Sequence, residues 1–309
     1  MPSRPLMSSR PPKIVRVRTA NNLIQHVEVL KRNRNKRHRS GEFLVEGVKA
    51  INQARAQQWT IKALVYSADR PLSAWARETL GATPEATHVE VTPSLMEQLS
   101  EKEDASELIA VVAIPDDTPA RIRLGDPALV AVFDRPTSPG NLGAIIRSCD
   151  ALNADGLIVT GHGADLYDPQ TVRASMGSLF ALPVARLASH VEVWRWVEEV
   201  GARSADRYGR MQIIGASGDA APAVDEVDLT RPTVLVLGNE TRGLSHGYRE
   251  LCDALVRIPM SGDQGAADSL NVACAASILL YEADRQRRAL WATSSSTRAG
   301  HGRFGQHWR

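Results

Sequence analysis

The sequence has 309 residues, of which 43% are apolar and 23% charged, a balance typical of a globular chain long enough for two packed domains. Its three cysteines, Cys149, Cys252 and Cys274, show neither CxxC spacing nor a nearby histidine pair, which argues against a zinc site. The longest apolar run, Val272 to Tyr281, is too short to cross a bilayer, and no apolar core follows the basic N-terminus. We therefore expect a cytoplasmic protein without a bound metal.

The formal net charge of +2 hides a separation of charge along the chain. Residues 1–40 hold 11 basic residues and one acidic residue, residues 285–309 hold six basic residues and no acid, and the body between them carries about −14. Basic chain ends are typical of phosphate binding, because each neutralised phosphate releases condensed counterions; a solubilising tail is the alternative. The candidate nucleic-acid contacts in the basic segment of residues 31–39 are Lys31, Arg32, Arg34, Lys36, Arg37 and Arg39.

The first part of the chain predicts a small α/β domain over residues 14–115. Residues 1–13, with four prolines and three serines, predict a disordered basic tail. A helical pattern starts at Asn21 and runs into the basic segment, a short strand follows at 43–47, and a helix reaches about Gln58. Apolar runs at 61–66, 89–91 and 108–114 alternate with helical stretches, and Pro115 to Pro119 is the expected linker.

The second part predicts a larger α/β domain over residues 120–288, followed by a flexible basic tail over 289–309. Continuous apolar runs occur at 129–133, 157–160, 212–216, 234–237 and 255–258, each followed by loop and helix signals. Such a pattern favours a largely parallel sheet covered on both faces. Ligands of these sheets bind at the carboxyl ends of the strands.

Three segments at strand ends carry small and polar residues. The first is Ser138-Pro-Gly-Asn-Leu-Gly143 with Arg147, where a helix capped by Asn141 would present its amides to an anion. The second, Leu237-Gly-Asn-Glu-Thr-Arg-Gly243, has Glu240 at its tip. The third runs from Ile258-Pro-Met260 to Ser269-Leu-Asn271, with Ser269 as the expected cap of an apolar helix. Taken singly, each is also explained by an ordinary cap or turn.

Several familiar site motifs are missing. The Gly140 to Gly143 spacing lacks the fuller dinucleotide fingerprint, and no GK[ST], GxSxG or HExxH motif occurs. A GxxG loop also clamps RNA in KH domains, but those loops favour basic residues between the glycines, whereas this chain has Asn141 and Leu142.

Taken together and in order, the three segments resemble the motifs of the SpoU/TrmH RNA methyltransferases. The stretch from Leu166 to Ser178 is also similar to that family, so the resemblance covers roughly residues 125–285. The segment Arg39-x3-Phe43-Leu-Val-Glu-Gly47 is similar to the substrate-binding domain, of ribosomal-protein-like fold, that often precedes the catalytic domain.

The resemblance implies an α/β trefoil-knot domain with a parallel sheet, a homodimer and S-adenosyl-L-methionine as cofactor. Matched residue by residue, it implies that Asn141, Arg147, Glu240, Ser269 and Asn271 are active-site residues. The implied cofactor-binding residues are Leu237, Gly238, Asn239, Ile258, Met260 and Leu270, and Arg173 joins the expected RNA contacts.

The implied reaction is methyl transfer to a ribose 2′-hydroxyl. Arg147 would act as the base or, since guanidinium holds its proton above pH 12, stabilise the developing alkoxide. The appended N-terminal domain favours ribosomal RNA over transfer RNA, and the layout is also similar to that of the thiostrepton-resistance methyltransferases. A non-catalytic RNA-binding or assembly factor and a base-nitrogen methyltransferase are the alternatives.

The sequence departs from the family pattern in two places. The run Asp263 to Asp268 is longer than the usual spacing before Ser-Leu-Asn, and Asp134 to Ser138 lacks the acidic residue often found before Pro-Gly-Asn.

Overall fold

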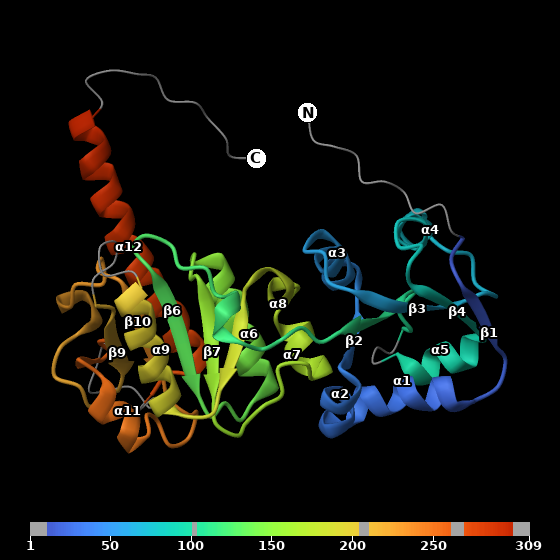
Figure 1. Cartoon of the computed structure of the whole chain (residues 1–309), viewed down its shortest axis with the longest axis horizontal. Coiled ribbons are helices and arrows are strands. Elements are labelled where there is room, and N and C mark those ends of the chain that lie inside the picture. Colours follow the sequence, from blue (N-terminus) through green and yellow to red (C-terminus); the bar gives the residue numbers. More distant parts are fainter. Residues whose placement is uncertain (1–10, 101–103, 204–209, 261–268, 299–309) are drawn as a thin grey trace. The chain divides into compact units, whose positions relative to one another are not determined.

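The computed structural model describes residues 11–100, 104–203, 210–260 and 269–298, with side chains in the last helix described to residue 290. The chain divides into two compact units (Figure 1). The first unit consists of residues 1–117, 138–147 and 164–182, and the second of residues 118–137, 148–163 and 183–309. The chain first passes from one unit to the other between residues 117 and 118, and the domain bounds of 14–115 and 120–288 stay a prediction.

A five-stranded mixed sheet is the centre of the first unit, with strand order β1-β4-β3-β5-β2. The strands β1, β3 and β4 are mutually parallel, and β5 runs antiparallel to β2 and β3. The elements are β1 (Ile14–Val17), α1 (Asn22–Arg32), α2 (Arg34–Ser40), β2 (Glu42–Glu46), α3 (Val48–Ala56), β3 (Ile61–Ser67), α4 (Ala74–Gly81), β4 (Thr87–Val91), α5 (Pro93–Leu99) and β5 (Ile109–Ala113).

Helices cover both faces of this sheet, with α1 and α5 on one side and α3 and α4 on the other (Figure 1). The core beneath α1 and α5 joins Ile24, Val27 and Leu30 of α1 to Leu95 and Leu99 of α5, over the inward side chains of the strands. The apolar spacing of α1 at three and four residues produces this buried face. The short helices α7 (Pro169–Ala174) and α8 (Ser178–Ala181) belong to the same unit.

The second unit contains a six-stranded parallel sheet of order β11-β9-β10-β6-β7-β8. Its strands are β6 (Leu129–Asp134), β7 (Gly156–Thr160), β8 (Val184–Leu187), β9 (Gln212–Ala216), β10 (Thr233–Leu237) and β11 (Ala254–Val256). Its helices are α9 (His190–Arg203), α11 (His246–Leu251) and α12 (Val272–Arg298), with short 3-10 turns at Pro119–Arg121 and Val224–Glu226. The parallel α/β architecture expected from the apolar runs is confirmed.

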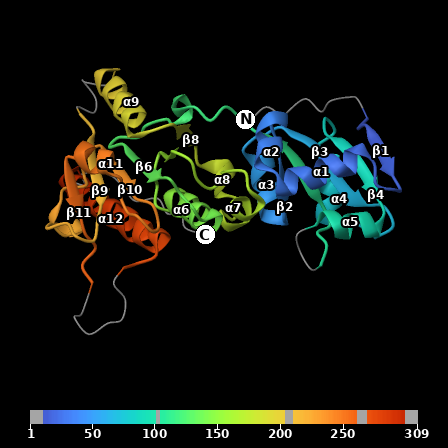
Figure 2. The same ribbon diagram turned by 90° about the horizontal axis from the view of Figure 1, so that it is seen from below.

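Alternation along the strands divides the core between the two faces of this sheet. Val130 and Val132 of β6 pack with Val193 and Val197 of α9 and Tyr248 of α11. On the other face lies α12, beside the C-terminal turn of α6 (Pro139–Ala151), where Ser148 and Ser277 share a hydrogen bond of 2.8 Å (Figure 2). The strand order reverses between β6 and β10, and a reversal of this kind is where parallel sheets bind ligands.

The buried side chain of Arg287 joins α12 to the backbone just before β6 and β10. Arg287 donates hydrogen bonds of 2.9–3.0 Å to the carbonyls of Pro127, Ala128, Leu229 and Arg231, which lie just before β6 and β10. The side chain is 8% exposed, and its burial lowers the pKa of the guanidinium from the usual arginine value. One side chain thereby donates to four carbonyl groups, of which those of Ala128 and Arg231 also accept hydrogen bonds from Thr233.

Two strands and one helix end differ from the sequence-based expectation. β1 and β8 were not predicted, because each has only four residues and both have side chains that reach solvent. The helix α12 continues to Arg298, past the boundary expected at 288, while residues 1–10 and 299–309 of the expected tails lie outside the described residues. None of the described helices is long and apolar enough to span a membrane.

Candidate active site

A cavity of about 350 Å³ lies at the carboxyl edge of the second unit's sheet. It is formed by the ends of β9, β10 and β11 together with the start of α12, elements that lie side by side in Figure 2. The lining residues are Ala216, Ser217, Gly218, Leu237, Gly238, Asn239, Glu240, Gly243, Val256, Arg257, Ile258, Met260, Ser269, Leu270, Val272 and Ala275. All six residues expected to bind the cofactor line this cavity, as do Glu240 and Ser269.

The loop after β10 folds back tightly because two of its residues are glycines. Gly243 adopts φ +65°, in the left-handed region that favours glycine. Asn239 and Gly243 exchange backbone hydrogen bonds of 2.9 and 3.0 Å. A Cβ atom at Gly238 would lie 2.2 Å from the carbonyl carbon of Gly243, so only glycine fits there. The loop therefore presents backbone, rather than a side chain, to the cavity at Gly238.

Side chains of this loop bind the segment that follows β6. The Glu240 carboxylate accepts hydrogen bonds from the Thr137 amide at 2.9 Å and from the Thr137 hydroxyl at 2.8 Å. The side-chain amide of Asn239 donates to the carbonyl of Arg135 at 2.7 Å. Its side-chain oxygen accepts hydrogen bonds from the backbone amides of Thr241 and Arg242. Glu240, expected as an active-site residue, thus joins the loop after β10 to the segment after β6.

Beneath these loops lies a buried polar chain that sequence reasoning missed. Asp134, at the end of β6, is 4% exposed and accepts hydrogen bonds from Arg135 Nε at 2.9 Å and Thr160 Oγ1 at 3.1 Å. The Tyr248 hydroxyl donates to Thr160 at 3.1 Å, and burial raises the pKa of that hydroxyl, which keeps it protonated. The available signal was Asp134 directly after a buried apolar strand, where a charge needs a partner.

The N-terminus of α12 is capped by Asn271. Its side-chain oxygen accepts from the amide of Ala273 at 2.8 Å, whereas Ser269, the expected cap, is exposed two residues earlier. The prediction that Ser269 caps this helix was wrong, because the cap lies two residues later. Serine and asparagine can both cap a helix, and the sequence does not fix where the first turn begins. The long run Asp263 to Asp268 lies outside the described residues.

Asn141 and Arg147 belong to the first unit, on the helix α6. The helix begins at Pro139, and Ser138 Oγ accepts the Asn141 amide at 3.3 Å, so Asn141 lies inside the first turn and is not the expected cap. Proline at the first helical position explains the earlier start. A Cβ at Gly143 would lie 2.5 Å from the Thr171 carbonyl oxygen, so α6 packs closely on α7. Arg147 is exposed.

Within the basic segment of residues 31–39, the structure contradicts the expected contact between Arg37 and RNA. Its side chain is 2% exposed and pairs with Asp165 at 2.7 Å and Asp168 at 3.2 Å, while donating to the Leu30 carbonyl at 2.9 Å. Burial alone would raise the pKa of Asp165, but the Arg37 charge and the His38 hydrogen bond lower it below its usual value. A guanidinium enclosed in this way cannot reach a phosphate.

The other predicted RNA contacts differ in exposure. Arg32, Arg39 and Arg173 are exposed, Arg34 and Lys36 are half-buried, and half-buried Lys31 donates to the Ser100 carbonyl at 2.8 Å.

Comparison with known proteins identifies the class to which this fold and cavity belong. The SpoU rRNA methylase family model matches residues 128–281, and the SpoU L30e-like domain model matches residues 21–110. The chain belongs to the SpoU methylase family, as its three ordered motifs predicted. It is 47% identical over 279 residues to a 23S rRNA (uridine(2479)-2′-O)-methyltransferase of Streptomyces viridochromogenes, covering 90% of this chain and 94% of that protein.

Solved structures agree with this assignment. The SpoU methyltransferase AviRb from Streptomyces viridochromogenes, in complex with AdoMet, is 48% identical with a TM-score of 0.81, covering 87% of this chain and 99% of that one. An AdoMet-bound rRNA methyltransferase from Sinorhizobium meliloti is 29% identical with a TM-score of 0.77, covering 88% and 98%. The expected α/β fold with a smaller N-terminal domain is confirmed, and the knot implied by the resemblance stays a prediction.

Proposed function

We propose that this chain transfers a methyl group from S-adenosyl-L-methionine to a ribose 2′-hydroxyl of ribosomal RNA. The observation that carries this proposal is the cavity at the carboxyl edge of the parallel sheet, lined by all six expected cofactor-binding residues. Family membership and the 47% identity to a 23S rRNA 2′-O-methyltransferase support the same reaction and substrate class. A ribosomal RNA substrate also favours a cytoplasmic location.

The residues around the cavity fit the proposed cofactor. A volume of about 350 Å³ lies within the ordinary range for small-molecule sites. Leu237, Ile258 and Leu270 offer apolar surface for a flat base and an aliphatic chain, and the missing side chain at Gly238 lets backbone groups approach the ligand. When bound, the cofactor supplies a methyl group activated by its sulfonium charge.

The roles proposed for the remaining residues follow the family motif. Glu240 holds the loop after β10 to Thr137 and so fixes that wall of the cavity. Asn271 fixes the first turn of α12, which places Ser269 at the cavity. Arg147, with Asn141 on the same helix, is proposed to act on the ribose hydroxyl, either taking its proton or stabilising the alkoxide.

A homodimer is part of the proposal. Cys274, Ile278 and Tyr281 repeat at four and three residues on α12 and are all exposed, with Arg285 and Arg288 continuing the same helical face. Ile278 and Tyr281 are 39% and 52% exposed. Exposed apolar side chains gathered on one helical face favour contact with a second apolar surface.

The function is tested with methyl-labelled S-adenosylmethionine and RNA lacking native methylation. Ribosomal and transfer RNA are separated after the reaction and digested to nucleosides. Label in a 2′-O-methylnucleoside from 23S rRNA is expected. Label only in transfer RNA would contradict the substrate, label on a base nitrogen would contradict the reaction, and cofactor binding without transfer to any RNA would favour the non-catalytic assembly factor. The nucleotide modified then separates a housekeeping role from protection against an antibiotic.

A further inference from the structure

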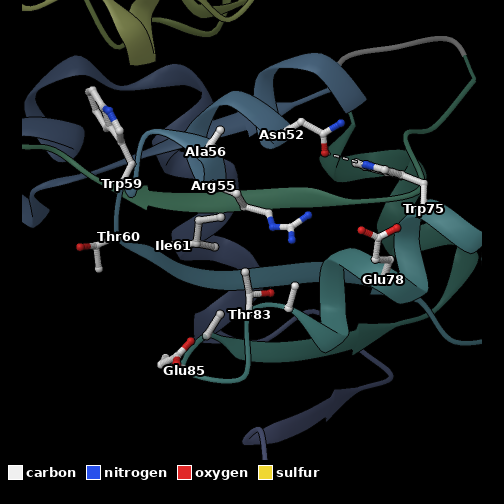
Figure 3. Close-up of a pocket in the computed structure, with 12 residues that line it drawn as sticks. Asn52, Arg55, Ala56, Trp59, Thr60, Ile61, Trp75, Glu78, Thr83 and Glu85 are labelled. Carbon is white, nitrogen blue, oxygen red and sulfur yellow. Dashed lines mark hydrogen bonds between the residues drawn. The ribbon is translucent and has the colours of Figure 1, made fainter. Parts of the chain in front are cut away.

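The first unit carries a second hollow, an open cleft of about 720 Å³ formed by α3, α4 and the segments that follow them (Figure 3). Asn52 and Arg55 are three residues apart on α3, and Trp75 and Glu78 are three apart on α4, so each pair shares a helical face. The Trp75 indole donates to Asn52 Oδ1 at 2.8 Å and joins the two helices at one end. Trp59 lies at the other end in Figure 3.

Two tryptophans, Trp59 and Trp75, line this cleft. The Trp59 indole donates to the Phe180 carbonyl at 3.0 Å, and that of Trp75 is bound to Asn52, so each N–H group has a protein partner. Both side chains are half-buried and line the cleft. The Trp59 ring packs edge-on against Phe43 and Phe180, with 6.0 and 5.1 Å between ring centroids. Trp75 therefore offers the flat apolar ring on which an unpaired base could stack.

The charged groups of the cleft do not pair with one another. Arg55 has one long hydrogen bond, from Nη1 to Thr79 Oγ1 at 3.5 Å, and forms no ion pair among the described residues. The carboxylates of Glu78 and Glu85 are exposed and also form no ion pair in the described part of the chain. In Figure 3 the Arg55 guanidinium and the Glu78 carboxylate both point into the hollow between the tryptophans.

We propose that this cleft binds an unpaired guanine of the RNA substrate. Guanine offers adjacent acceptors, O6 and N7, to the guanidinium fork, and adjacent donors, N1–H and N2–H2, to a carboxylate. No other RNA base combines these two edges. The choice of RNA as ligand rests on the proposed function, and the match of residues 21–110 to the SpoU L30e-like domain covers the cleft.

The test is titration of the full-length protein with GMP, AMP, CMP and UMP, in which tryptophan fluorescence reports binding. Saturating S-adenosylhomocysteine keeps the nucleotides out of the cavity in the second unit. GMP is expected to give a saturable change and to bind at least ~10-fold more tightly than the other three, the discrimination of one bidentate contact. Trp75→Phe should remove most of the change, whereas Trp194→Phe, at an exposed tryptophan of α9, should retain it.

Two further variants test the pairing chemistry. Arg55→Ala is expected to weaken GMP binding at least ~10-fold, and Glu78→Gln should remove the preference for GMP over AMP. Equal responses to the four nucleotides, or a GMP response that survives both substitutions, would overturn the proposal. GMP binding without methyl transfer would count against the proposed function alone, and methyl transfer without GMP binding would count against the cleft alone.

Discussion

Arg147 is the residue on which the proposed chemistry depends most. It is exposed on α6, about two turns after Pro139, the first residue of that helix. Arg147→Ala is expected to lower the turnover of methyl transfer at least ~100-fold while cofactor binding stays measurable, because loss of a base or an alkoxide stabiliser leaves the cofactor cavity intact. Single-turnover methylation and calorimetry measure the two effects. Near-normal single-turnover methylation would remove Arg147 from the mechanism, and Arg210→Ala, at an exposed arginine outside the cavity lining, is the control.

Gly238 is expected to tolerate no side chain. In Gly238→Ala the new Cβ would meet the backbone of Gly243 and the amide of Leu244 at 2.2–2.3 Å, which forces the loop to move. We expect cofactor affinity to fall at least ~10-fold, the size expected when backbone groups that surround a ligand are displaced by about 1 Å. Gly81→Ala is the matched control, because nothing lies within 4 Å of its Cβ. Unchanged cofactor affinity in Gly238→Ala would contradict the placement of this loop at the cofactor.

Arg37 is expected to stabilise the fold rather than bind RNA. Arg37→Ala leaves Asp165 buried without its cation, so the free energy of unfolding should fall by about 3–5 kcal/mol. Chemical denaturation measures this loss, and Arg32→Ala, at an exposed neighbour, should change stability by less than ~0.5 kcal/mol. A loss no larger than that of the control would show that the buried pair does not stabilise the unit.

The same pair predicts a dependence on pH. Arg37 and His38 hold the pKa of Asp165 below its usual value, so their stabilisation is present above the ordinary aspartate range and is lost as pH falls through the folded pKa. In Arg37→Ala, burial favours the neutral carboxyl group instead. The difference in stability between the two proteins should therefore shrink on acidification.

Single residues show where sequence reasoning reached its limit. The cavity residues from Leu237 to Leu270 could be predicted because each motif follows a buried strand directly, and parallel strands end at one edge. The burial of Arg37 could not, since its partner Asp165 is 128 residues away and a run of charge resembles a solvated face. The buried chain through Asp134 and Tyr248 was missed for the same reason of distance in sequence.

Among the elements, the basic segment formed by the end of α1 and the helix α2 is expected to contribute to RNA binding through its outer side chains. Replacing Arg32, Lys36 and Arg39 with alanine should weaken RNA affinity and reduce the slope of log K against log salt by up to ~3, because each phosphate contact releases counterions. Three exposed arginines elsewhere, Arg77, Arg195 and Arg231, provide a variant of equal charge change. Equal slopes in the two variants would make the segment an ordinary solvated surface.

The length and burial of each element decided whether the sequence could predict it. Strands buried along their whole length, such as β6, β7 and β10, give unbroken apolar runs and were placed within a residue or two. The four-residue strands β1 and β8 carry too few apolar residues to form a pattern. Helix starts were misplaced at both α6 and α12, where a serine and an asparagine compete for the capping position.

For the whole molecule, the proposed homodimer predicts that charge on the exposed face of α12 gives a monomer. The double substitution Ile278→Glu and Tyr281→Glu places two carboxylates where apolar side chains would be buried. Light scattering after size exclusion should show the mass fall from two chains to one. Trp194→Glu, which charges a different exposed apolar position on α9, should leave the dimer intact. A dimer that survives the first change but not the second would move the interface to α9.

The strand order of the second sheet sets the order in which the chain can acquire structure as it leaves the ribosome. The first sheet uses only residues 14–113, so all its strands are available early in synthesis. The central pair of the second sheet joins Leu129 of β6 to Thr233 of β10. β7 follows soon after β6, but the partner on the other side of β6 is made only about a hundred residues later. The four carbonyls that Arg287 binds wait longer still. A nascent chain halted before α12 would carry a finished N-terminal sheet and a second sheet that lacks its last helix.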